Sequence, residues 1–214
     1  MKSRAFPRMG ISIAVILVGL TTAAYAGPPL ICHAIVIGPA KTLPWVDLNY
    51  HKGDGSYDLK NLPGDTLAIL DSKAPVLVRM ETLRRATIYA RQDPQVAKEL
   101  LVRLRARAGN PEAAGVFDSL AWFDVGYLVE TYQQWFGKGE SNPAAGVDGY
   151  ALVKKAIRLR GPDPEMEFAA AMISLMTGPQ DEFREHAHRA AAGAKSDSLL
   201  AENLSNAPGG EFKN

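Results

Sequence analysis

The sequence predicts an all-α fold of antiparallel helical hairpins, preceded by an irregular N-terminal arm. Apolar residues recur at steps of three and four over most of residues 75–205, a spacing that places them on one face of a helix. Asp-Pro pairs stand where two of these stripes begin, and glycine or proline stands where most of them end. A helical domain over residues 75–205 is therefore expected.

Residues 27–74 are predicted to form the irregular, extended arm. Prolines and glycines interrupt this stretch too often for long helices. Its apolar patches, at residues 30–37 and 43–48, are expected to pack across the helices. Residues 50–63 are expected to form a polar loop rich in turns.

Residues 1–26 are predicted to be a secretory signal peptide. Three basic residues precede an apolar run over residues 11–20, and the small residues Ala24 and Ala26 provide a cleavage site after Ala26. The run is only about half of the roughly 20 apolar residues that a membrane helix needs. The sequence thus predicts a periplasmic or secreted protein, with no stable membrane insertion after cleavage.

The charge balance argues against nucleic acid as a partner. The chain has 24 basic and 23 acidic residues, and cleavage would remove three basic and no acidic ones, which leaves 21 against 23. Binding to DNA, RNA or an anionic membrane surface relies on a sizeable excess of positive charge. A nearly neutral mature chain points to another class of partner.

Apolar stripes and capping residues predict the first two helices of the domain. The first begins after Pro75 and carries a stripe that faces the core, formed by Val76, Met80, Leu83, Thr87 and Ala90. The second begins at Pro94, with Asp93 as its N-cap. The Gly-Asn-Pro sequence at residues 109–111 is expected to end it.

The third helix, over about residues 113–136, is predicted to be central, because it is apolar on nearly every side and includes Phe117. A loop over residues 137–149 follows. Each later helix is bounded by glycine, proline or an Asp-Pro cap, and they are expected over residues 150–160, 165–176, 180–194 and 198–204. The tail over residues 206–214 is expected to be flexible and to fray.

An internal similarity joins the two halves of the helical domain. Setting residues 83–86 over residues 153–156 also sets Asp93-Pro94 over Asp163-Pro164, at an offset of 70 residues. This offset equals two units of about 35 residues, the period of helical-hairpin repeats.

The region around this similarity resembles tetratricopeptide repeats. Residues 150–171 resemble the boundary between two repeats, and residues 121–126 (Ala-Trp-Phe-Asp-Val-Gly) resemble the start of a first repeat helix. The resemblance covers about residues 75–195 and departs from the family at Val129, where tyrosine is expected, and in the long loop after Gly137. It implies stacked hairpins whose concave surface binds peptides or other proteins. A plain helical bundle is the alternative.

Asp124 falls among apolar positions of the third helix. A buried carboxylate needs a partner, and three arginines are candidates to neutralise it: Arg79, Arg84 and Arg85. In the alternative interpretation, Asp124 anchors a ligand in a groove lined by three aromatic residues: Trp122, Tyr127 and Trp135.

Basic residues gather on three of the predicted helices, and they are Arg84, Arg85, Arg103, Arg105, Arg107, Lys154, Lys155 and Arg158. They are interpreted as solvated helix edges whose long stems cover apolar surface. If stacking of the helices aligns them, they would attract an acidic partner.

Two groups in the arm are candidate metal sites. Cys32, His33 and His51 could ligate a metal with another group, although the chain has no second cysteine and no paired His or Cys spacing typical of zinc or haem sites. A buried, inert Cys32 is the simpler interpretation. Residues 54–65 follow part of a calcium-loop pattern, but Leu59 stands where that loop needs glycine, so an ordinary turn is expected.

His186 and His188 cannot hold one ion together, because side chains two residues apart on a helix point about 200° apart. His186 is expected to lie on a solvated, ion-paired face with Glu182, Glu185 and Arg189. No metal or cofactor is predicted.

No catalytic motif is evident in the sequence. The expected function is therefore an exported protein- or peptide-interaction module without evident catalytic activity. The alternative is a helical protein that binds a small molecule or a metal, through Asp124 and the aromatic helix or through Cys32, His33 and His51.

Overall fold

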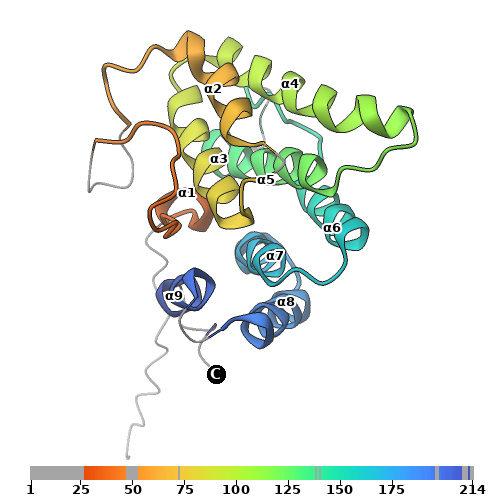
Figure 1. The fold of residues 1–214 in the computed structure, drawn as a ribbon. Helices are drawn as coiled ribbons and strands as arrows, with labels where there is room; N and C mark the ends of the chain where they lie inside the picture. The colour runs from red at the N-terminus through yellow and green to blue at the C-terminus, as the bar shows by residue number, and fades with distance from the viewer. Residues whose placement is uncertain are drawn as a thin grey trace, which may run out of the picture.

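The computed structural model describes residues 27–46, 53–71, 73–137, 139, 141–195, 198–208 and 212. In this part of the chain all regular elements are helical, which confirms the all-α fold (Figure 1). The elements are α1 (Pro29–Cys32), η1 (Leu59–Asn61), α2 (Leu62–Ile69), α3 (Val76–Ala90), α4 (Pro94–Ala113), α5 (Ser119–Phe136), α6 (Gly149–Arg160), α7 (Pro164–Thr177), α8 (Gln180–Gly193) and α9 (Leu199–Asn206). The predicted signal peptide and His51 lie outside the described residues.

Three helices form the centre of the molecule. α3, α5 and α7 bury most of their side chains, and α7 is enclosed from Met166 to Leu175. α2, α4 and the arm cover α3 and α5, whereas α8 and α9 cover α7 (Figure 1). α6 leads from the first group to the second. The predicted central position of the third helix is confirmed, and two further helices share it. None of the described helices is long and apolar enough to cross a membrane.

The junction between α4 and α5 differs from the prediction. α4 does not end at Gly109 but continues through Pro111 to Ala113. Proline lacks only its own N–H group, so in the last turn of a helix it removes a single hydrogen bond. Gly115, with φ of 79°, makes the turn, and α5 then begins at Ser119. Phe117 consequently lies before the helix and is 60% exposed, so its predicted place in the core was wrong.

The arm contains more helix than its composition predicts. α1 and α2 both lie within residues 27–74, and α2 accommodates Pro63 in its first turn, where the missing N–H group has no helical partner to lose. The arm does lie across the helices. Its Leu30 N–H donates to Oε1 of Gln134 on α5 at 2.8 Å. The backbone of Val36 exchanges two hydrogen bonds of 2.9 Å with the Asn203 side chain on α9.

The tail was predicted to be flexible from residue 206, but Asn206 still belongs to α9 and two later residues are buried. Ala207 packs in the core, and the ring of Phe212 lies 5.7 Å from that of Phe168 and 5.2 Å from that of Phe183. Burial of an aromatic ring between two others outweighs the fraying expected at a chain end.

Both Asp-Pro pairs cap helices as predicted. Asp93 accepts hydrogen bonds from the first turn of α4, and Asp163 does so for α7. However, the chain forms three helices between the two caps: α4, α5 and α6. Two complete helical hairpins would place four helices there. The most extensive pairing joins α5 with α6 and α7 with α8. The resemblance to tetratricopeptide repeats therefore stays a prediction.

Candidate functional site

Asp124 is held by arginines inside the molecule. Its side chain is 0% exposed, and its Oδ2 lies 2.6 Å from Nη1 of Arg79 and 3.5 Å from Nη2 of Arg107. Burial raises the pKa of Asp124 to about 7, against the lowering effect of these two charges. Arg79 also donates to backbone carbonyl groups of the α2–α3 loop, so the pair fastens that loop to α5. Arg79 is one of the three partners considered from the sequence.

The aromatic residues near Asp124 do not line a groove with it. Tyr127 is fully buried against Phe123. The ring of Trp122 is covered by Nζ of Lys155 at 3.7 Å, and that of Trp135 by the guanidinium of Arg91 at 4.7 Å. Of four hollows in the described part of the chain, none is lined by Asp124 together with these side chains. The ligand groove predicted around Asp124 is not among them, because the rings face different neighbours.

Arg84 and Arg85 hold the arm against α3. Arg84 is 1% exposed, and both residues donate from Nε to the carboxylate of Glu81, at 2.8 and 2.7 Å. Nη1 of each residue donates to an arm carbonyl group, that of Arg84 to Ile31 at 2.9 Å and that of Arg85 to Leu43 at 2.8 Å. We call Glu81, Arg84 and Arg85 the arm clamp. A partner cannot reach Arg84 while the arm is in place.

Glu81 is the centre of the arm clamp. Its Oε2 also accepts the backbone N–H of Ile35 at 3.0 Å. Burial by itself would raise the pKa of Glu81. The hydrogen bonds and the charge of Arg84, together with hydrogen bonds from Ile35 and Arg85, outweigh burial and hold the pKa below its ordinary value of 4.5. The carboxylate is thus ionised at neutral pH, and the clamp is a buried ion cluster.

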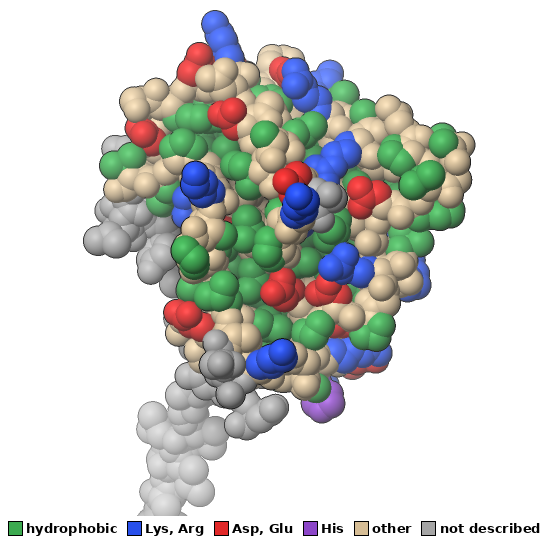
Figure 2. Space-filling view, in the orientation of Figure 1, with side chains coloured by type: hydrophobic (Ala, Val, Ile, Leu, Met, Phe, Trp, Pro, Cys, Tyr) green, Lys and Arg blue, Asp and Glu red, His purple; other side chains and the backbone are tan. Residues whose placement is uncertain are grey.

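Lys154 and Lys155 point to different sides of α6. Nζ of Lys154 lies 3.1 Å from Glu182 on α8, whereas Nζ of Lys155 lies 2.6 Å from Glu112 on α4. Lys154 and Lys155 therefore do not combine into one basic surface, which was the condition for attracting an acidic partner. On the face shown in Figure 2, Lys and Arg side chains are scattered among acidic and apolar ones.

The described arm residues do not form a metal centre. Cys32 is half-buried, and burial raises the pKa of its thiol. Burial, followed by the charge of Arg84, lowers the pKa of His33. Within the described residues no group of three or more His, Cys, Asp or Glu side chains could hold a metal ion. His51, the third candidate, lies outside them.

A hollow that combines an apolar lining with charged groups lies between α6 and α8. It has a volume of about 640 Å³ and is open to solvent. Its floor includes Pro164 and Glu167 of α7, and its walls include Ile157 of α6 and Ala192 of α8. Three basic side chains also line it: Arg158, His188 and Arg189. We call this hollow the α6–α8 groove.

A chain of hydrogen bonds runs from the floor of the groove across three helices. The carboxylate of Glu167 on α7 contacts Nδ1 of His186 on α8, whose Nε2 lies 2.9 Å from the hydroxyl of Tyr150 on α6. That hydroxyl donates to Oε2 of Glu182 at 2.6 Å, and Lys154 donates to the same oxygen. The network braces α6, α7 and α8 against one another and fixes Glu167.

The predicted position of His186 on a solvated face was wrong. It is 7% exposed, not part of a solvated face, whereas His188 is exposed and points elsewhere, as the helix geometry requires. The charged residues around His186 in the sequence hid its burial. Its spacing is the signal that could have found it, because it stands three residues after the buried Phe183 and four before the buried Ala190.

The chemistry of Tyr150 favours a structural role for this network. Burial, together with its hydrogen bond to Glu182, raises the pKa of the Tyr150 hydroxyl well above its ordinary value of 10.0. A carboxylate–imidazole–hydroxyl chain activates a nucleophile only if the hydroxyl can lose its proton. Here the hydroxyl remains a donor to a carboxylate.

Comparison with protein families, curated proteins and solved structures finds no match to this chain.

Proposed function

We propose that the protein is an exported interaction module that binds an acidic segment of a partner protein, with an apolar side chain of that segment placed in the α6–α8 groove. The observation that carries the proposal is an apolar hollow of about 640 Å³ with basic side chains in its lining. Tetratricopeptide domains typically bind peptides or proteins, and the resemblance in the sequence supports the same class of function.

The chemistry of the groove favours an apolar anchor with a neighbouring carboxylate. Burial of one leucine-sized side chain contributes about 1.5–3 kcal/mol. Within the described residues, Arg158 forms no ion pair, so its guanidinium is available to a partner's carboxylate. Arg189 is partly engaged, since it lies 3.6 Å from Glu167 and also contacts Glu185. Charge complementarity of this kind gives specificity and a faster association rate.

The open shape of the groove favours a peptide over a small molecule. Sites for small ligands enclose most of the ligand surface. The α6–α8 groove instead exposes one side to solvent, so a chain can enter and leave it while one side chain is buried.

Fluorescence polarisation with peptide pools tests this proposal. The first pool would consist of labelled heptapeptides with a central leucine flanked by aspartate or glutamate, and the second would replace the acidic residues with lysine. The acidic pool should bind, and Arg158→Glu should weaken binding by about tenfold or more. Ala192→Phe, which fills the hollow, should weaken it as well.

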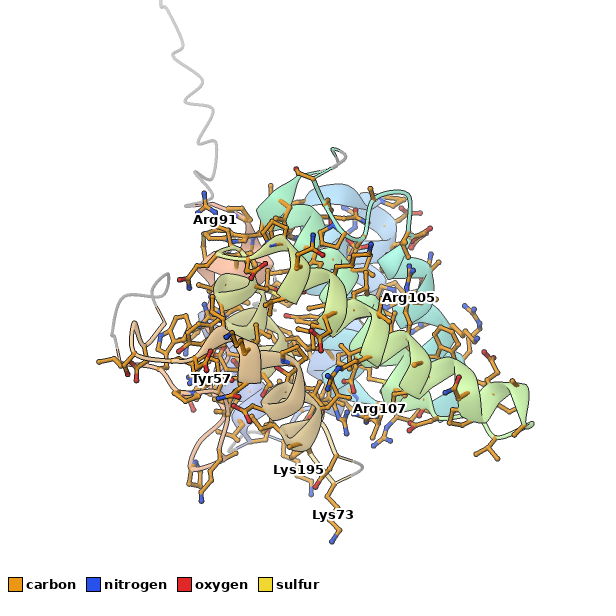
Figure 3. The ribbon with its side chains drawn as sticks, turned by 90° about the horizontal axis from the view of Figure 1, so that it is seen from above. Tyr57, Lys73, Arg91, Arg105, Arg107 and Lys195 are labelled. Atoms are coloured by element: carbon orange, nitrogen blue, oxygen red, sulfur yellow. The ribbon has the colours of Figure 1, made fainter. Side chains whose placement is uncertain are left out.

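The matched control is Arg105→Glu, because Arg105 is also an exposed arginine but lies on α4, far from the groove in the sequence and outside its lining (Figure 3). This variant should bind the acidic pool like the wild type. Equal binding of both pools, or equal effects of the two arginine variants, would contradict a specific acidic partner.

We also propose that the chain is exported and cleaved after Ala26. The basic N-terminal residues, the short apolar run and the small residues before Gly27 support this proposal. N-terminal sequencing of protein recovered from the periplasm or the medium should begin at Gly27. Recovery of the intact N-terminus from the cytoplasm alone would refute it.

A further inference from the structure

A second hollow adjoins the α6–α8 groove. It has a volume of about 490 Å³ and lies where the α2–α3 loop, the α6–α7 turn and the segment between α8 and α9 meet. The two hollows share part of their lining, in Pro162, Asp163, Pro164 and Gly193. They are therefore neighbours on one surface.

The second hollow presents two lysines without ion-pair partners among the described residues. Lys73 and Lys195 both line it, from segments far apart in the sequence, and both are exposed. Figure 3 shows them at the same edge of the molecule. We call this hollow the Lys73–Lys195 pocket. A third cation, Arg160, is paired with Asp163 at 2.5 Å.

The acidic groups of the pocket are already used by the fold. Asp163 caps α7 through the N–H groups of its first turn, in addition to its pair with Arg160. Glu165 is partly buried and accepts the N–H of Leu77, at the start of α3, at 3.3 Å. Burial raises the pKa of Glu165. Arg160 balances Asp163, and the two lysines outnumber Glu165, so the three cations and two acidic groups of the lining leave a net charge of +1, which favours an anion.

The residues of α8 that separate the two hollows have small side chains. Residues 192–194 read Ala-Gly-Ala, so no long side chain stands on the α8 side. Gly193 lies directly against the ring of Pro164, where an added Cβ would overlap the ring. A peptide backbone that passes from one hollow to the other would therefore meet only small side chains on the α8 side.

We infer that the Lys73–Lys195 pocket is a second subsite for the partner segment, which binds a carboxylate of that segment a few residues away from its apolar anchor. This inference rests on the proposed function of the α6–α8 groove. Neighbouring round hollows of about 490 and 640 Å³ would have centres roughly 10 Å apart, which about three extended residues cover. The segment is thus acidic at two places and apolar between them.

Peptides with one or two anchors test the inference. A one-anchor peptide carries leucine and one flanking aspartate, and two-anchor peptides add an Asp-Asp pair after a glycine-serine spacer of one, three or six residues. On the wild-type protein, the three-residue spacer should give binding at least about fivefold tighter than the one-anchor peptide, and the advantage should shrink at high salt. The one-residue spacer should give no advantage.

The double variant Lys73→Glu/Lys195→Glu should lose this advantage and keep one-anchor binding. Lys73→Gln/Lys195→Gln is a milder version, and far-UV circular dichroism checks that both remain folded. Arg105→Glu, which changes the net charge without touching either hollow, is the control and should keep the advantage.

The outcomes separate the two proposals. If the one-anchor peptide binds the wild type but no spacer improves binding, or the double variant keeps the full advantage, the second subsite is refuted and the groove proposal stands. If no peptide binds the wild type, the proposed function of the groove fails, and the subsite fails with it.

Discussion

A close approach of two helices offers a quantitative test of the fold. α5 and α6 meet at Gly126, where an added Cβ would lie 2.7 Å from the carbonyl oxygen of Gly149 and 2.8 Å from the nitrogen of Val153. Carbon atoms in ordinary contact stay about 3.5–4.0 Å apart. Gly126→Ala therefore requires the two helices to separate by roughly 0.7 Å or more.

The separation should cost more than the helix gains. Alanine is favoured over glycine within a helix by about 1 kcal/mol. Overpacking a rigid contact costs typically about 1–3 kcal/mol, and here the obstacles are backbone atoms that cannot rotate away. The shift also stretches the hydrogen bond of 2.9 Å from the Tyr150 N–H to Glu130. We expect a net destabilisation of about 2 kcal/mol, or a Tm lower by about 4–8 °C.

Gly109→Ala is the matched control, because Gly109 is also helical but an added Cβ there meets nothing within 4 Å. That variant should be stabilised by about 0.5–1 kcal/mol. Urea unfolding followed by far-UV circular dichroism, together with calorimetry, measures both changes. Gly126→Ala as stable as the wild type, or both variants shifted equally, would refute the packing argument.

Three further predictions concern the arm, α8 and α9. The pKa of Glu81 is lowered in the native state, so the stabilisation that Glu81 gives is present above about pH 4.5 and is lost as the pH falls through the native value. Glu81→Gln should therefore flatten the decline in stability below about pH 4.5, measured by urea unfolding. An unchanged decline would be evidence against the clamp. Asn203→Ala leaves the N–H and C=O of Val36 unpaired and should lower the free energy of unfolding by about 1–3 kcal/mol, with faster amide exchange at Val36. The control Ser205→Ala, at an exposed position of the same helix, should change the free energy of unfolding by no more than about 0.5 kcal/mol. Equal effects would contradict the arm–α9 link. His186→Ala removes a hydrogen-bond partner of the buried Glu167 and should lower the free energy of unfolding by about 1–3 kcal/mol, measured by thermal or urea unfolding. His188→Ala should change stability little, because His188 is exposed. A larger loss for His188→Ala than for His186→Ala would show that His186 is not the buried histidine.

Local residue patterns predict some features of the fold and of the candidate site but not others. The caps Asp93 and Asp163 and the core stripe of α3 were predictable, because a cap bonds to N–H groups two and three residues away and a stripe depends on helical periodicity alone. Arg84 and His186 were misplaced for one common reason. Each stands among charged neighbours in the sequence, and each is buried by a segment that lies 19 or more residues away.

Local periodicity, capping and composition predict the helical class of this protein, most of its helix starts and an arm across the helices. Which side chains face solvent depends instead on contacts between segments that are far apart in the sequence. The arm closes over Arg84, α7 brings Glu167 to His186, and the turns around Pro164 and Lys195 place two hollows side by side. Contacts between distant segments follow from the summed packing of many weak interactions, which no single local pattern records.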